Sequence, residues 1–83
     1  MKQIAYSKSA SRMLLRMPRT DAARIRQKVD QYAANPLSLA ANVKKMQGRP
    51  GYRMRVGDWR IIFDENEYVI GIEEIGSRGS IYE

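Results

Sequence analysis

The chain has 83 residues, 43% of them hydrophobic, which is enough for the core of one small domain and too short for two. It contains no cysteine and no histidine, which excludes disulfides, thiolate nucleophiles, cysteine-based zinc sites and the commonest general base. The net charge is +6, and residues 1–60 hold 14 basic and 3 acidic side chains against 1 and 6 in residues 61–83. Such a basic domain suggests nucleic acid or an acidic protein as a partner, although a soluble protein can also simply be basic.

Nothing in the sequence indicates a membrane segment or a signal sequence. The N-terminus lacks an apolar signal region, and no stretch approaches the roughly 18 apolar residues of a membrane helix. The absence of cysteine also fits an intracellular protein. We therefore expect a cytoplasmic protein with no membrane partner.

The first 18 residues predict a strand followed by a helix. Residues 2–6 alternate in the way that is typical of a short strand. Ser7 or Ser9 can cap the helix that follows, and Pro18 ends it because proline lacks the amide donor. The apolar positions of this helix follow helical spacing: Ala10, Met13, Leu14 and Met17.

A second helix is predicted between Thr20, a possible cap, and the stop signal Asn35-Pro36. Its apolar stripe consists of Ala22, Ile25, Val29, Tyr32 and Ala33. The short connection between the helices predicts an antiparallel helical hairpin. Residues 36–51 fit neither period well, so we expect a short helical turn and then a basic loop. That loop would carry Lys44, Lys45 and Arg49.

Residues 52–64 are the most informative part of the chain and predict a hairpin whose turn is Gly57-Asp58. In that register Val56 faces Trp59 and Arg55 faces Arg60. One face would carry Tyr52, Met54, Val56, Trp59, Ile61 and Phe63, and the open face Arg53, Arg55 and Arg60. Like charges opposite one another destabilise a sheet, so this face suggests a surface built for a polyanion.

After a turn at residues 65–67, residues 68–75 predict a third strand, which Gly76 interrupts before an irregular tail over 77–83. The predicted fold class is therefore α+β. It has an N-terminal strand, a two-helix antiparallel hairpin and a three-stranded antiparallel meander, which form one sheet packed on the helices. The acidic residues near the C-terminus have no spacing typical of a metal site, and we interpret them as solvated turn and edge positions: Asp64, Glu65, Glu67, Glu73 and Glu74.

The sequence resembles the RelE/ParE toxin superfamily of type II toxin–antitoxin systems. The similarity is loose over residues 39–46 and close over 52–63, and it continues in Ile75-Gly76-Ser77-Arg78-Gly79-Ser80-Ile81-Tyr82. The preceding order of one strand and two helices is also similar, so the resemblance covers nearly the whole chain. It implies a single RelE-like toxin domain over residues 1–83.

The superfamily contains two activities: RelE-like members cut mRNA in the ribosomal A site, and ParE-like members inhibit DNA gyrase. RelE-like members carry basic residues and a tyrosine at the positions that match Arg53, Arg55, Arg60, Arg78 and Tyr82. All five are present, which favours a ribosome-dependent mRNA endonuclease. The chain departs from that branch at three positions. Lysine is common there where this chain has Arg53 and Arg55. The residue before the C-terminal arginine is often histidine or lysine there, but here it is Ser77.

Metal-independent RNA cleavage needs a base for the 2′-hydroxyl, positive charge on the transition-state phosphate, and an acid for the leaving oxygen. Because guanidinium matches phosphate oxygens, we hypothesise that Arg60 and Arg78 stabilise the transition-state charge and that Arg53 and Arg55 hold flanking phosphates, one of them as a candidate proton donor. Tyr82 would stack on a base or orient the 2′-hydroxyl. Contacts with RNA or the ribosome would extend to Lys44, Lys45, Arg49 and Ser77. No metal or cofactor is expected.

Other interpretations remain open at this stage. The chain could be a gyrase inhibitor, or an inactive member that binds an antitoxin. Arg60 could form a surface ion pair with Asp58 or Glu74, and Tyr82 could close the core beside Ile81. The resemblance also implies a cognate antitoxin, partly acidic, which would wrap the helices or the open sheet. Operator DNA would be bound indirectly, through that toxin–antitoxin complex.

Overall fold

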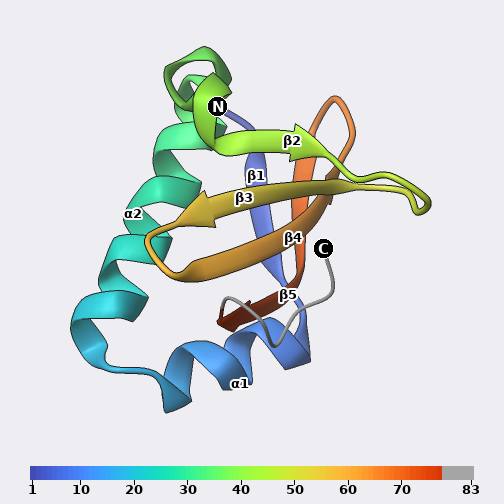
Figure 1. Ribbon diagram of the computed structural model, residues 1–83. Coiled ribbons are helices and arrows are strands. Elements are labelled where there is room, and N and C mark those ends of the chain that lie inside the picture. Colours follow the sequence, from blue (N-terminus) through green and yellow to red (C-terminus); the bar gives the residue numbers. More distant parts are fainter. Residues whose placement is uncertain (78–83) are drawn as a thin grey trace.

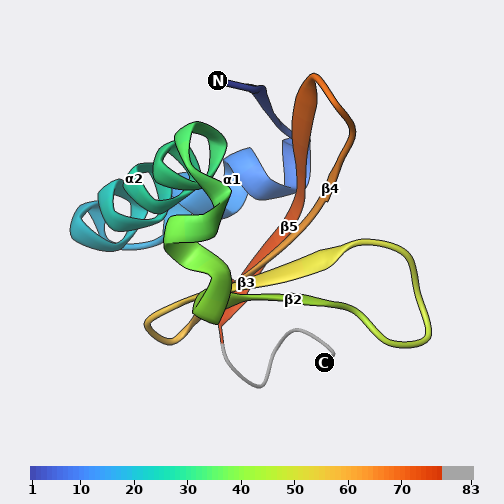
Figure 2. The ribbon, with the colours of Figure 1, turned by 90° about the horizontal axis from the view of Figure 1, so that it is seen from above.

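The computed structural model describes residues 1–77, which form a five-stranded sheet with its helices on one side (Figures 1 and 2). The elements in chain order are β1 (Gln3–Tyr6), α1 (Lys8–Arg16), α2 (Arg19–Ala34), the 3₁₀ helix η1 (Pro36–Asn42), β2 (Val43–Lys45), β3 (Tyr52–Val56), β4 (Trp59–Glu65) and β5 (Val69–Ser77). In Figure 1, α1 crosses below the sheet and α2 rises beside it. The predicted α+β class and element order are confirmed.

The strands lie in the order β1-β5-β4-β3-β2. The three consecutive strands β3, β4 and β5 form the predicted antiparallel meander. β1 lies beside β5 and runs parallel to it, a pairing that becomes possible because the two helices carry the chain back across the sheet. The first and last described strands are therefore neighbours. At the opposite edge of the sheet, β2 pairs with β3.

Ser7, one of the two predicted candidates, is the N-cap of α1. Its Oγ accepts a hydrogen bond from the Ala10 amide at 3.0 Å and donates one to the Glu73 carbonyl at 2.6 Å. The helix ends before Pro18, also as predicted. The predicted cap at Thr20 is wrong: α2 already begins at Arg19, with Pro18 at the N-cap and no side-chain cap. The Pro18 carbonyl accepts from the amides of Asp21 at 3.0 Å and Ala22 at 3.1 Å, so a backbone oxygen serves the first turn.

The core lies between the sheet and the two helices. The stripe of α2 contributes Ile25, Val29, Tyr32 and Ala33, and α1 contributes Ala10 and Leu14, each buried. Met54, Ile61 and Phe63 meet them from the sheet and are at most 1% exposed. Phe63 also contacts two tyrosine rings: it stacks on Tyr52 at 5.5 Å and meets Tyr32 edge-on at 5.2 Å. Every one of these positions belongs to a predicted apolar face.

Two predictions about local structure are wrong. Residues 43–45 form a strand, β2, rather than part of a basic loop, because they pair with β3 in antiparallel register. Gly76 does not interrupt the last strand, since β5 runs to Ser77 and Gly76 pairs with Arg60. The irregularity lies earlier, between Ile62 and Phe63 of β4, where the pairing with β5 shifts register.

Candidate active site

The β3–β4 hairpin sets the geometry of the site. Its turn is Gly57-Asp58, with Gly57 at φ +59° and no positive φ at Asp58. A positive φ at only the first turn residue is the pattern of a type II′ hairpin turn, which favours glycine there. The resulting register is the predicted one: Val56 faces Trp59 and Arg55 faces Arg60.

The two faces of this hairpin divide as predicted, with one difference. Met54, Val56 and Ile61 are buried toward the helices, so the alternating arginines point to the other side of the sheet. That side is not uniformly exposed: Arg60 is 9% exposed and Ile62 is fully buried. This face is therefore solvated at Arg55, partly covered at Arg53 and closed at Arg60.

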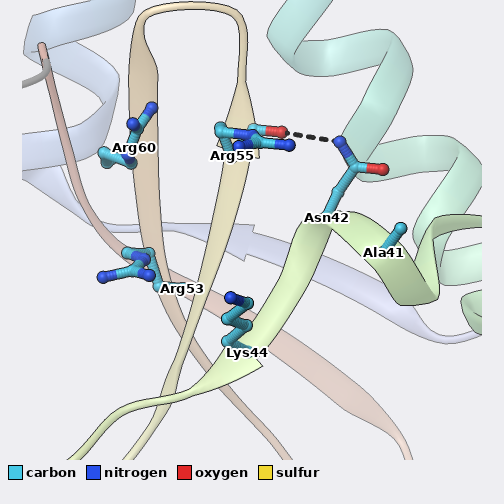
Figure 3. A pocket seen from close by; sticks show the side chains of 6 residues that line it. All are labelled: Ala41, Asn42, Lys44, Arg53, Arg55 and Arg60. Carbon is cyan, nitrogen blue, oxygen red and sulfur yellow. Dashed lines mark hydrogen bonds between the residues drawn. The ribbon is translucent and has the colours of Figure 1, made fainter.

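The three arginines line one pocket together with a lysine of the neighbouring strand (Figure 3). Its lining consists of Ala41, Asn42, Lys44, Arg53, Arg55 and Arg60. Lys44 reaches it because β2 places that residue directly opposite Arg53. Four of the six lining side chains are cationic and none is acidic. The pocket is thus suited to an anion with several oxygens, and guanidinium groups match phosphate well.

Arg60 is held in place by backbone oxygens. Its Nη1 donates to the Gly57 carbonyl at 3.3 Å and to the Trp59 carbonyl at 3.2 Å. Charge-assisted hydrogen bonds of this kind restrict a guanidinium that would otherwise sample many rotamers. Trp59 is itself fixed, because its Nε1 donates to the Asp21 carboxylate at 3.1 Å. The turn, the first turn of α2 and Arg60 therefore form one connected unit.

Asn42, which no sequence pattern singled out, joins the pocket wall to the hairpin. Its Nδ2 donates to the Arg55 carbonyl at 3.3 Å, across from the end of η1 to β3 (Figure 3). An asparagine in a segment with no clear periodicity carries no recognisable signal. Only the position of η1 against β3 reveals the contact.

The sequence model described as "ParE toxin of type II toxin-antitoxin system, parDE" matches residues 4–82. The chain belongs to this toxin family. The toxin is also similar to solved RelE structures, so its place in the RelE/ParE superfamily is confirmed. None of the curated proteins matches the toxin significantly in sequence.

Three solved structures show how far the toxin's similarity extends. A chain of the archaeal RelE–RelB complex from Pyrococcus horikoshii OT3 is 26% identical, with a TM-score of 0.80 over 96% of the toxin and 98% of that chain. The RelB–RelE complex from Methanococcus jannaschii gives 27% identity and a TM-score of 0.75, with 95% of each chain covered. YafQ from E. coli strain BL21(DE3) is 19% identical with a TM-score of 0.77 over the full length of both chains, which supports the fold alone.

The remaining predicted site residues of the toxin lie in different places. Lys45 lines a neighbouring pocket together with Lys44 and Arg53. Arg49 lies outside the pocket lined by the three arginines and forms an ion pair with Glu74 at 3.6 Å. The sequence had suggested Glu74 as one possible partner of Arg60 instead. Ser77 ends β5 opposite Trp59. Arg78 and Tyr82, with the suggested packing beside Ile81, lie outside the described residues.

The acidic residues of the toxin do not all have the predicted solvated role. Glu65 accepts a hydrogen bond from the Tyr32 hydroxyl at 2.7 Å and pairs with the Lys2 ammonium at 2.9 Å. Burial and this hydrogen bond raise the pKa of Tyr32 above its ordinary value. Within residues 1–77, no group of histidine, cysteine or acidic side chains could hold a metal ion. No helix in the same range is long and apolar enough to cross a membrane.

Proposed function

We propose that this toxin is a ribosome-dependent mRNA endonuclease that cleaves without a metal and thereby inhibits translation. The observation that carries the proposal is that Lys44, Arg53, Arg55 and Arg60 line one pocket. No acidic side chain lines that pocket, so a phosphodiester would meet only positive charge and the amide of Asn42. Similarity to solved RelE chains at 26% and 27% identity supports the same activity class.

In the proposed reaction the 2′-hydroxyl attacks the adjacent phosphorus, and the bond to the 5′-oxygen breaks. A base removes the 2′ proton and an acid returns one to the leaving oxygen, which gives a 2′,3′-cyclic phosphate and a free 5′-hydroxyl. Arg60 holds the charge that develops on the non-bridging oxygens, because two carbonyls fix its guanidinium before substrate arrives. Arg53 and Arg55 hold the flanking phosphates, and one of them protonates the leaving oxygen.

The C-terminal residues complete the proposed site. Arg78 adds positive charge at the phosphate, and Tyr82 stacks on a base or orients the 2′-hydroxyl. Arginine is a poor proton acceptor, so positioning by the ribosome supplies part of the rate that acid–base chemistry does not. Contacts with mRNA or ribosomal RNA extend along the surface through Lys44, Lys45, Arg49 and Ser77.

The toxin is proposed to have a cognate antitoxin. The solved relatives from Pyrococcus horikoshii and Methanococcus jannaschii are complexes of RelE with RelB. A partly acidic antitoxin would complement the basic surface of this toxin and could order as it binds. Binding of operator DNA would then occur through the complex, with the antitoxin as the DNA-contacting partner.

Inhibition of DNA gyrase is the second candidate, and the family description in terms of ParE favours it. The two activities are separable in one experiment. The toxin is added to a cell-free translation reaction, mRNA 5′ ends are mapped by primer extension, and naked mRNA is treated alongside. Plasmid supercoiling by gyrase is measured at the same toxin concentrations.

Cuts that appear at A-site codons only on translated mRNA, with supercoiling unaffected, are the expected result. Arg60→Gln should remove them. Because Arg60 is buried, its variant is checked for folding by circular dichroism, and the exposed Arg55→Gln provides a second test of the same pocket. Intact mRNA with inhibited supercoiling would replace the proposal with gyrase inhibition. Neither effect would indicate an inactive member that binds its antitoxin.

A further inference from the structure

Helix α1 presents an oblique row of three cations to solvent: Lys8, Arg12 and Arg16, here called the α1 ridge. Successive members are four residues apart, so they follow one another along the helix at a rise of about 6 Å. All three are exposed, and Ala10 and Leu14 are buried on the other side of the helix. The ridge is therefore a solvent-facing line of like charge rather than part of the core.

No ion pair involves the ridge in the described part of the toxin. The sequence of α1, Lys-Ser-Ala-Ser-Arg-Met-Leu-Leu-Arg, contains no acidic residue. The two ion pairs found within residues 1–77 are Lys2–Glu65 and Arg49–Glu74, which involve neither α1 nor its ridge. The acidic partners in these pairs, Glu65 and Glu74, therefore do not neutralise the ridge.

This arrangement opposes the stability of the helix. Like charges four residues apart repel one another on a helix surface. Lys8 also stands in the first turn, where the helix dipole disfavours a cation and no acidic residue offsets it. Arg16, in the last turn, is the one member that the dipole favours. A ligand with a row of negative charges would relieve the repulsion, which a single anion could not do along the whole helix.

The ridge is separate from the arginine pocket. The buried side of α1 belongs to the same core as Ile61 and Phe63, so the helix lies on the face of the sheet opposite the pocket arginines. No residue of α1 lines the pocket. In Figure 1, α1 forms the lower boundary of the described fold, with its outer surface turned away from the strands.

We propose that the α1 ridge binds the phosphate backbone of a double-stranded RNA segment, independently of sequence, as a second nucleic-acid site. A regularly charged strand is the ligand whose geometry matches evenly spaced cations on a straight element. Base edges take no part, because the ridge offers only long cationic side chains that reach backbone oxygens. The site goes beyond the proposed cleavage activity and does not depend on it.

The test uses a fluorescein-labelled RNA hairpin with a fully paired stem as the probe, and fluorescence anisotropy over a series of KCl concentrations. All proteins carry Arg60→Gln, so that the probe stays intact. The variant Lys8→Gln/Arg12→Gln/Arg16→Gln is compared with Arg24→Gln/Arg26→Gln/Lys28→Gln, which removes the same charge from α2. Each ridge cation that neutralises a phosphate contributes about 0.9 to the slope of log K against log salt.

The ridge variant should lower this slope by about two to three, and the α2 variant by clearly less. Equal losses in the two variants would show a diffuse effect of net charge and overturn the proposal. An unchanged slope in the ridge variant would also overturn it, and would leave an acidic protein as the partner for this surface. Thermal unfolding of both variants confirms that they are folded. Cleavage of translated mRNA by the ridge variant with native Arg60 is measured separately. Failure of the proposed cleavage activity can then be told apart from failure of the proposed ridge site.

Discussion

Arg55 and Arg60 stand directly opposite one another on β3 and β4, and Arg60 is 9% exposed. Two like charges at a cross-strand pair oppose sheet formation, and burial of one of them adds a desolvation penalty. The backbone carbonyls that accept from Arg60 offset part of this penalty. The hairpin therefore concentrates positive charge at a position where stability alone would favour an uncharged pair.

The repulsion predicts that Arg55→Thr stabilises the fold while it weakens the site. Threonine suits a strand and removes the like charge opposite Arg60, so the free energy of unfolding should rise by about 0.2–1 kcal/mol. Urea unfolding measures this change, and RNA cleavage in translation extracts should fall in parallel. Gln3→Thr, at an exposed strand position outside the pocket, controls for the strand propensity of threonine and should leave cleavage unchanged. A loss of stability in Arg55→Thr would mean that Arg55 contributes packing that outweighs the repulsion.

Substitutions at Arg60 should separate charge from geometry. Arg60→Gln removes the charge and is expected to lower the cleavage rate by about 10²- to 10³-fold, as for loss of one transition-state donor. Arg60→Lys keeps the charge but loses the two-pronged guanidinium, so an intermediate rate is expected. Single-turnover cleavage on programmed ribosomes is the measurement. Equal rates for the two variants would show that charge at this position does not stabilise the transition state.

The pocket could be predicted from the sequence only in part. Alternation in residues 52–63 and the glycine at position 57 determine which arginines share a face, because strand periodicity and turn type are local properties. The contribution of β2 is not local. Lys44 enters the pocket through pairing with β3, and a three-residue strand with two lysines lacks the apolar alternation that would reveal it.

Contacts between residues far apart in the chain could not be predicted from the sequence either. Glu65 stands in an acidic segment that resembles a solvated turn, yet it accepts a hydrogen bond from Tyr32, 33 residues earlier in the chain. The parallel pairing of β1 with β5 has the same character, since it depends on how the helices return the chain. Such contacts depend on how the elements pack together, and the local hydrophobic periodicity of one element does not identify the elements beside it.

Ser7 and Ser9 were equal candidates for the cap of α1, and their alanine variants should differ clearly. The Ser7 hydroxyl joins the Ala10 amide to the Glu73 carbonyl, so it ties the helix start to β5. Ser7→Ala should lower the free energy of unfolding by about 1–2 kcal/mol. Ser9→Ala, at an exposed position inside the helix, should change it little or raise it slightly. Chemical denaturation of the two variants decides between these expectations.

The Tyr32–Glu65 hydrogen bond predicts a loss of stability at alkaline pH. Tyr32 is 6% exposed, and burial, followed by its hydrogen bond to Glu65, raises its pKa above the ordinary value near 10. Above about pH 10 the unfolded chain releases the Tyr32 proton while the folded chain retains it. The unfolded state then binds fewer protons, so the contribution of Tyr32 is complete below this pH and declines as pH rises.

The variant Tyr32→Phe isolates this contribution. It should be less stable than the native toxin near neutral pH by about 1 kcal/mol, because the Glu65 carboxylate loses one donor while Lys2 remains. Between about pH 10 and pH 11 the native protein should lose up to about 1.4 kcal/mol more than the variant, the linkage value for one proton. Urea unfolding at several pH values measures both slopes. Ionisation of Tyr6, whose pKa is also raised by burial, is common to the two proteins and cancels in the difference. Parallel slopes would show that Tyr32 ionises equally in the folded and unfolded states.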